Sequence, residues 1–174
     1  SPYIEPERLT IGSLMRNAGY TTACVGKWHL GLDWQLKDDS KPQILTPKKF
    51  GYTNTDFSAP VKRGPTELGF DYSFILPASL DMPPYAFVRN DRVVDPDVIL
   101  TADAYPKKQD ETVYAWDRKH TNENDIYWER GVWWRNGEMS RSFKFEECFP
   151  TIVDEGIAFI GKDERTSHSF YICR

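Results

Sequence analysis

Lys27 and His29 are the two residues whose types and spacing could do chemistry together. Lysine, whose side chain ordinarily has a pKa of about 10.4, is a cation at neutral pH and suits an anion whose charge is spread over several oxygens. Histidine, whose side chain ordinarily has a pKa of about 6.5, can donate and accept a proton near pH 7. A cation that holds an anion and an imidazole that moves a proton are two parts of a group-transfer site.

The residues around this pair predict how it is presented. Two β-branched threonines followed by three apolar residues at 21–25 are typical of a short buried strand. If the extended backbone continues, Lys27 and His29 share one side, while Trp28 and Leu30 face the other as apolar anchors. On spacing alone, the alternative is a lysine at a strand end beside a packed loop histidine. A nucleotide-phosphate loop is excluded, because six residues instead of four separate the glycines and Trp28 follows the lysine.

The preceding residues predict the element that leads into this strand. Apolar residues recur at three- and four-residue gaps over 7–18, which predicts a helix that begins near Pro6. Gly19 is its expected left-handed cap. A helix followed by a strand is a step of an α/β sheet, and in such sheets ligands bind beyond the carboxyl ends of the strands.

The run 19–29, Gly-Tyr-Thr-Thr-Ala-Cys-Val-Gly-Lys-Trp-His, closely resembles the second signature of the sulfatase family, the arylsulfatase-like branch of the alkaline phosphatase superfamily. Leu-Gly-Phe-Asp-Tyr at 68–72 and Trp-Arg-Asn-Gly-Glu at 134–138 resemble the same family in the same order. The resemblance implies an α/β fold: part of an alkaline-phosphatase-like sandwich, with a central, mostly parallel sheet flanked by helices. Because sulfatases are much longer, residues 1–174 are expected to be an internal piece of the N-terminal catalytic domain and inactive alone.

The resemblance also implies a mechanism. In the family, a hydrated formylglycine attacks the sulfur of a sulfate ester, and calcium and several cations neutralise the sulfate. Lys27 would hold sulfate oxygens or the second oxygen of the nucleophile, and His29 would orient that hydroxyl or assist its deprotonation. The nucleophile and the calcium ligands match no position here, so no metal ligand is expected within the chain.

Cys148 begins a run that resembles the formylglycine motif Cys-x-Pro-x-Arg. Its fifth residue is Ile152 instead of arginine, the run falls on a predicted helix at 149–161, and it follows Lys27, whereas the family places the nucleophile before. Cys148 is therefore expected to be structural. The other cysteines, Cys24 and Cys173, are far apart, so three cysteines imply no disulfide framework.

A second strand is predicted at 70–76, followed by a proline-rich loop at 77–85. Because this order repeats that of the first site, Ser79 and Asp81 are expected to reach the same cleft and bind substrate, as a serine at the matching place does in related arylsulfatases. The alternative is that Ser79 caps a turn and Asp81 accepts bonds from backbone amides.

The remaining segments are less regular. Residues 33–65 are expected to be a surface insert and 95–130 a family-specific excursion rich in aromatic residues. Hairpins are predicted at 85–94 and at 132–139, the latter around Asn136-Gly137. A final strand is expected at 169–173 in the same sheet.

Composition limits the partners. The chain has 174 residues, with 22 basic against 26 acidic side chains and a net charge of −4, which argues against a nucleic-acid surface. No apolar run approaches the roughly 20 residues of a membrane helix. The resemblance implies a sulfated small molecule or glycan as substrate and a periplasmic or extracellular location. The alternatives are a phosphatase or phosphodiesterase of the same superfamily and a non-catalytic glycan-binding relative.

Overall fold

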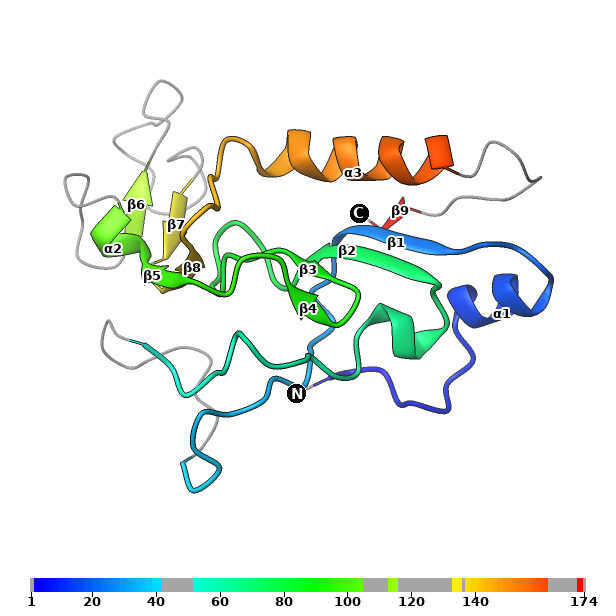
Figure 1. Ribbon diagram of the computed structural model, residues 1–174, viewed down its shortest axis with the longest axis horizontal. Coiled ribbons are helices and arrows are strands. Elements are labelled where there is room, and N and C mark those ends of the chain that lie inside the picture. Colours follow the sequence, from blue (N-terminus) through cyan, green and yellow to red (C-terminus); the bar gives the residue numbers. More distant parts are fainter. Residues whose placement is uncertain are drawn as a thin grey trace, which may run out of the picture.

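The computed structural model describes residues 2–41, 52–104 and 137–162, and as backbone the strands at 113–115, 133–135 and 172–173. Its main sheet has five strands in the order β4-β3-β2-β1-β9 (Figure 1). These strands are β1 (Ala23–Lys27), β2 (Tyr72–Leu76), β3 (Val88–Arg89), β4 (Arg92–Val93) and β9 (Ile172–Cys173). The chain therefore has a mixed α/β fold.

The sheet is parallel at its centre and antiparallel toward one edge. β1 pairs in parallel with both β2 and β9, which confirms that the C-terminal strand joins the same sheet. β2 pairs antiparallel with β3, and β3 with β4. The hairpin predicted at 85–94 is confirmed, with Asn90 at a φ of 55° in its turn. This short hairpin adds two antiparallel strands to a sheet that was expected to be mostly parallel.

Helix α1 (Ile11–Asn17) begins later than the sequence pattern indicated. Thr10 is its N-cap, and Thr10 and Ser13 form a reciprocal capping box that satisfies the first free amides. The predicted start near Pro6 is therefore wrong. The predicted apolar face is also largely exposed within this chain, since Ile11 and Leu14 are 47% and 50% exposed. Gly19 has the expected positive φ, at 88°.

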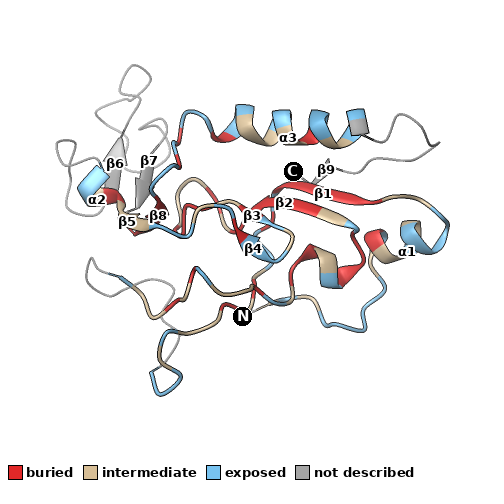
Figure 2. Ribbon diagram, in the orientation of Figure 1, coloured by how far each residue is buried: buried red, intermediate tan, exposed pale blue. Residues whose placement is uncertain are grey.

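The core lies on both faces of β1 and β2, which are buried almost throughout (Figure 2). On one face, Cys24 and Ile75 join a cluster formed with the segments that follow the first site. On the other, Val25 and Phe74 pack toward helix α3 (Cys148–Lys162), which lies along the sheet (Figure 1). Burial on both faces explains why neither strand shows an alternation of apolar and polar residues.

A polar clamp ties α3 to the sheet. The Arg89 guanidinium binds the Glu155 carboxylate, with Nη2 2.8 Å from Oε2, and the Tyr72 hydroxyl donates to the same carboxylate. Burial and the bond to Glu155 raise the pKa of Tyr72, and the bond to Glu155 raises the pKa of Arg89. Arg89 also lies over the Phe74 ring, 5.1 Å from its centroid. These contacts fix which face of α3 meets the sheet.

Two small sheets lie at one end of the molecule (Figure 1). β5 (Val98–Leu100) pairs with β8 (Glu138–Ser140), and β6 (Val113–Ala115) pairs with β7 (Trp133–Arg135). The hairpin predicted at 132–139 is therefore wrong, because its two strands pair with different partners. Gly137 has a packing role instead: a Cβ there would lie 2.4 Å from Cγ of Pro83. The short helices α2 (Thr101–Ala104) and η1 (Pro65–Leu68) complete the described elements.

The segment 33–65 is only partly a surface feature. Two isolated bridges, Asp33 with Lys62 and Leu36 with Thr55, hold its described parts together. Its buried aromatic side chains, Trp34 and Phe57, contribute to the core with ring centroids 5.4 Å apart. In the described part of the chain, no helix has the length and apolar character needed to cross a membrane. Most of the excursion 95–130, including Lys119 and His120, lies outside the described residues.

Candidate functional site

Lys27 and His29 lie at the carboxyl end of β1, beside the end of β2. Lys27 is the last residue of β1 and pairs with Leu76, the last residue of β2. The two chains stay together beyond the strands, because Trp28 N–H donates to Leu76 O at 2.9 Å and His29 N–H donates to Pro77 O at 3.0 Å. The side chains of Lys27 and His29 are both exposed, so both are accessible from solvent.

The anchor beneath the pair is Trp28. Its side chain is 6% exposed, and its indole N–H donates to Gly31 O at 2.8 Å, so both its apolar and polar parts are satisfied. The anchoring role expected for Leu30 is wrong, because that side chain is 37% exposed. His29 has a φ of 54°, so the extended backbone ends before it. Strand alternation therefore positions Lys27 but not the His29 imidazole.

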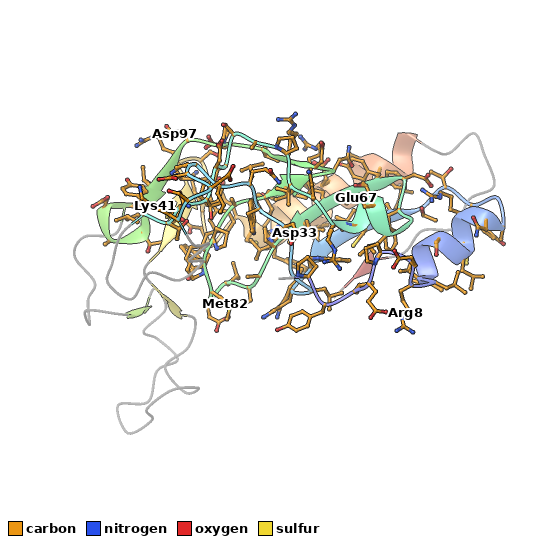
Figure 3. All side chains as sticks on the ribbon, turned by 90° about the horizontal axis from the view of Figure 1, so that it is seen from below. Arg8, Asp33, Lys41, Glu67, Met82 and Asp97 are labelled. Atoms are coloured by element: carbon orange, nitrogen blue, oxygen red, sulfur yellow. The ribbon has the colours of Figure 1, made fainter. Side chains whose placement is uncertain are left out.

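A cavity of about 300 Å³ opens next to His29. One side is formed by the residues after β1, including Gly31, Leu32 and Trp34, and the other by the loop after β2. That loop contributes Ala78 and three prolines together with Met82, which is labelled in Figure 3. The volume is at the lower end of the range for small-molecule pockets, about 300 to 1,000 Å³. Lys27 is not among the residues that line it.

Ser79 and Asp81 lie on the same loop but bond to each other. The Ser79 hydroxyl donates to Oδ1 of Asp81, and Met82 N–H donates to Ser79 O at 3.1 Å, closing a turn. Ser79 is 8% exposed and Asp81 is half-buried, and neither lines the cavity. Their neighbours Ala78 and Met82 do line it. The loop that carries Ser79 and Asp81 therefore flanks the cavity, while their side chains stabilise its turn.

The end of this loop is fixed by β8. Tyr85 is fully buried, its N–H donates to Glu138 O, and its own carbonyl accepts from Ser140 N–H, each at 2.9 Å. The buried Glu138 carboxylate accepts two bonds from Thr53, from the amide at 2.9 Å and from the hydroxyl at 2.6 Å. These contacts join three segments that are far apart in sequence and fix the end of the loop that lines the cavity.

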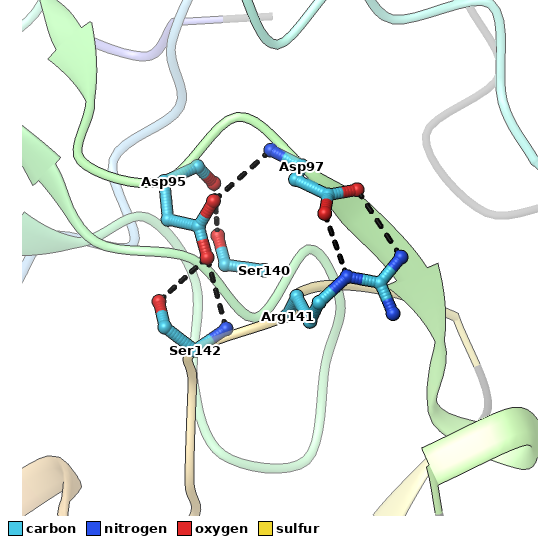
Figure 4. Close-up of polar contacts among 5 residues, drawn as sticks. All are labelled: Asp95, Asp97, Ser140, Arg141 and Ser142. Carbon is cyan, nitrogen blue, oxygen red and sulfur yellow. Dashed lines mark hydrogen bonds and ion pairs between the residues drawn. The ribbon is translucent and has the colours of Figure 1, made fainter.

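A second set of polar contacts secures the far end of β8 (Figure 4). The Asp95 carboxylate accepts from Ser142 N–H at 2.9 Å, from the Ser142 hydroxyl at 2.6 Å and from Asp97 N–H at 3.1 Å. Burial acts to raise the pKa of Asp95, but these hydrogen bonds together outweigh burial and lower that pKa. Arg141 binds Asp97, with Nε 2.6 Å from Oδ2. This cluster holds the residues after β4 to those after β8 and is structural.

Cys148 lies at the first position of α3 and is 3% exposed. Burial raises the pKa of its thiol to about 11, so the reactive thiolate is scarce at neutral pH. These facts agree with its expected structural role. Among residues 2–41, 52–104 and 137–162, no group of three or more His, Cys, Asp or Glu side chains could hold a metal ion.

We expect the Cys148 thiol to resist alkylation in the folded protein. At pH 8 a thiol of pKa about 11 is about one part in a thousand thiolate, whereas a free cysteine of pKa about 8.5 is about a quarter thiolate. Iodoacetamide labelling at pH 8, followed by peptide mass spectrometry, should be at least about 200-fold slower in native protein than in guanidinium. Equal rates would contradict the burial of this thiol.

Several cavity residues carry no clear sequence signal. Tyr3, Leu32 and Trp34 lie outside the two motifs that the sequence analysis singled out. Tyr3 reaches the cavity because its N–H donates to Leu30 O at 2.9 Å, a contact between segments that no local pattern reveals. The prolines of the loop 77–85 are the exception, because they predict a rigid loop after the second strand, and all three line the cavity.

Comparison with known proteins gives a consistent result. No family model matches the sequence. Over 167 residues the chain is 30% identical to N-acetylgalactosamine-6-O-sulfatase of Bacteroides thetaiotaomicron, a match that covers 90% of this chain and 29% of that protein. It is also 47% identical over 36 residues to steryl-sulfatase of Rattus norvegicus, covering 21% of this chain and 6% of the relative.

A solved structure extends the likeness to the fold. It comes from work on the metabolism of multiple glycosaminoglycans by Bacteroides thetaiotaomicron, and it matches with a TM-score of 0.61 and 26% identity. The match covers 99% of this chain and 34% of the solved chain. The chain thus spans about a third, or less, of the length of the relatives that it matches.

Proposed function

This chain is a sulfatase homologue, and from that premise we propose that the full-length protein hydrolyses sulfate esters of glycans. The observation that carries the proposal is the position of Lys27 and His29 at the carboxyl ends of two parallel, buried strands, beside a cavity of ligand size. In α/β sheets this edge is where ligands bind. The name of the bacterial relative favours a 6-O-sulfated N-acetylgalactosamine as substrate, and the solved structure, which comes from work on glycosaminoglycan metabolism, favours a glycosaminoglycan as its source.

The two candidate catalytic side chains have complementary roles. Sulfate ester hydrolysis breaks an S–O bond and releases an alcohol and sulfate, so negative charge develops on the oxygen of the departing alcohol while the sulfate oxygens remain anionic. The exposed Lys27 ammonium can bind those oxygens, and the cation is worth most where charge develops. His29 can transfer a proton to or from the reacting oxygens. Trp28 fixes the backbone from which both side chains extend.

Ser79 and Asp81 are proposed to act on substrate through their loop. The Asp81 carboxylate accepts a hydrogen bond from the Ser79 hydroxyl. This bond stiffens the turn whose residues Ala78 and Met82 line the cavity. A substrate that reaches this turn would meet a carboxylate with one oxygen already hydrogen-bonded. The remaining lone pairs of this carboxylate can accept a hydrogen bond from a sugar hydroxyl without a large movement of the loop.

The calcium ion and the formylglycine of the family do not fit the described residues. The described residues contain no cluster of side chains that could hold a metal ion, and Cys148, which would have to become formylglycine, is buried on a helix. We therefore propose that the nucleophile and the metal ligands come from the rest of the full-length protein, in an alkaline-phosphatase-like sandwich. Because anionic polysaccharides do not cross membranes unaided, a periplasmic or extracellular location is proposed.

An assay of the full-length protein tests this function. The protein would be incubated with a 6-O-sulfated N-acetylgalactosamine oligosaccharide and, separately, with a matched phosphate ester, and the released anion measured by ion chromatography. Release of sulfate with little release of phosphate is expected. Preferential release of phosphate would favour a phosphatase of the same superfamily. Binding of the oligosaccharide without release of either anion would favour a non-catalytic glycan-binding relative.

A further inference from the structure

Helix α3 carries an exposed row of large apolar side chains. Phe149, Val153, Ile157 and Ile160 are 75%, 39%, 61% and 46% exposed, and we call these four residues the α3 stripe. Their spacing of four, four and three residues places them on one side of the helix. Exposed apolar residues are common singly, but a continuous row of four on one helix is typical of a contact surface.

The stripe does not face the sheet of this chain. Ile152, Glu155 and Phe159 point to the sheet, where Ile152 and Phe159 pack on the β1 and β2 side chains and Glu155 binds Arg89. Successive helical residues are about 100° apart around the axis. The stripe residues therefore point, on average, about 120° away from the direction of the residues that face the sheet. The clamp at Glu155 holds this orientation. Rotation of α3 therefore cannot bury the stripe without breaking the contacts with the sheet.

The form of the stripe indicates what covers it. Phe149, Val153 and Ile157 follow an i, i+4, i+8 row, the ridge that fits between the side chains of another helix. Pro150 and Gly161, which flank the row, are also exposed and small enough for a close approach. A partner of this kind would lie beside and over α3, on the side away from the main sheet.

The comparisons indicate where that helix comes from. The match to the solved structure covers 99% of this chain but 34% of the solved chain, so about two thirds of such a protein lie outside the matched part and could supply a covering helix. We propose that the α3 stripe is an internal interface, covered by an amphipathic helix of the full-length polypeptide outside these 174 residues. The proposal goes beyond sulfate hydrolysis and concerns the assembly of the protein.

Substitution of Ile157 in the full-length protein tests this interface. Ile157→Glu would place a charge in an apolar contact and should lower Tm by at least about 5 °C. Ile157→Leu should keep Tm within about 2 °C, because it retains an apolar side chain of the same volume. Ala158→Glu is the matched control, since Ala158 is exposed on α3 outside the stripe and receives the same charge.

Three outcomes would overturn the proposal. An unchanged Tm for Ile157→Glu would show that the stripe faces solvent in the full-length protein. An equal fall for Ala158→Glu would show that the effect belongs to the helix and not to the stripe. A lower mass by light scattering for Ile157→Glu would show that a second copy covers the stripe. These readouts do not depend on sulfatase activity, so failure here is distinguishable from failure of the proposed function.

Discussion

Replacing Lys27 by alanine in the full-length protein is expected to lower kcat/KM for a sulfated sugar about 10²- to 10³-fold. The exposed Lys27 ammonium at the end of β1 is proposed to bind the sulfate, and loss of a single group that stabilises developing negative charge typically has an effect of this size. The rate of sulfate release, measured over a range of substrate concentrations, gives kcat and KM separately.

The split between the two constants identifies the role of Lys27. If the ammonium stabilises the transition state more than the bound substrate, most of the loss falls on kcat. Lys27→Arg keeps the charge but changes its shape and should recover only part of the rate. Lys62→Ala is the matched control, because Lys62 is exposed and lies on another segment. Activity within about threefold of wild type for Lys27→Ala would remove Lys27 from the proposed mechanism.

The local part of the site could be predicted from sequence. The strand, predicted at 21–25 and observed at 23–27, and the buried Trp28 depend on residues adjacent in the chain, so the local pattern indicates both, although Lys27 ends the strand instead of lying in the loop beyond it. The position of His29 could not be predicted from alternation, because its positive φ ends the strand geometry. Tyr3 reaches the cavity through a contact with Leu30, and no local pattern encodes a contact of that kind.

The fold shows the same division. Helix α3 and the hairpin at Arg89 and Arg92 follow from periodicity and turn residues, and both are confirmed. The hairpin expected at 132–139 is wrong. Asn-Gly is typical of a hairpin turn, but here the glycine, Gly137, allows close contact with Pro83 instead. The start of α1 was missed because a serine, Ser13, stands where a capping box usually has Glu or Gln.

Gly69→Ala is expected to have the largest effect on stability, a loss of about 3 to 5 kcal/mol or failure to fold. Gly69 ends the turn η1 with a φ of 103°, a conformation that strains any residue with a side chain. It also lies against the first turn of α1, where an added Cβ would be 2.3 Å from Ser13 N and 2.5 Å from Ser13 Cα. Both atoms are backbone, so relief requires that the first turn of α1 move away from Gly69.

Gly19→Ala separates the two causes. Gly19 also has a positive φ, 88°, but a Cβ there would meet no atom within 4 Å, so only the backbone strain of about 1 kcal/mol applies. Calorimetry of the two full-length variants should therefore show a much lower Tm, or no cooperative transition, for Gly69→Ala alone. Because the clash is with backbone, a second substitution at Ser13 should not restore stability. Equal shifts for the two glycines, or rescue by Ser13→Gly, would show that α1 does not depend on close contact with Gly69.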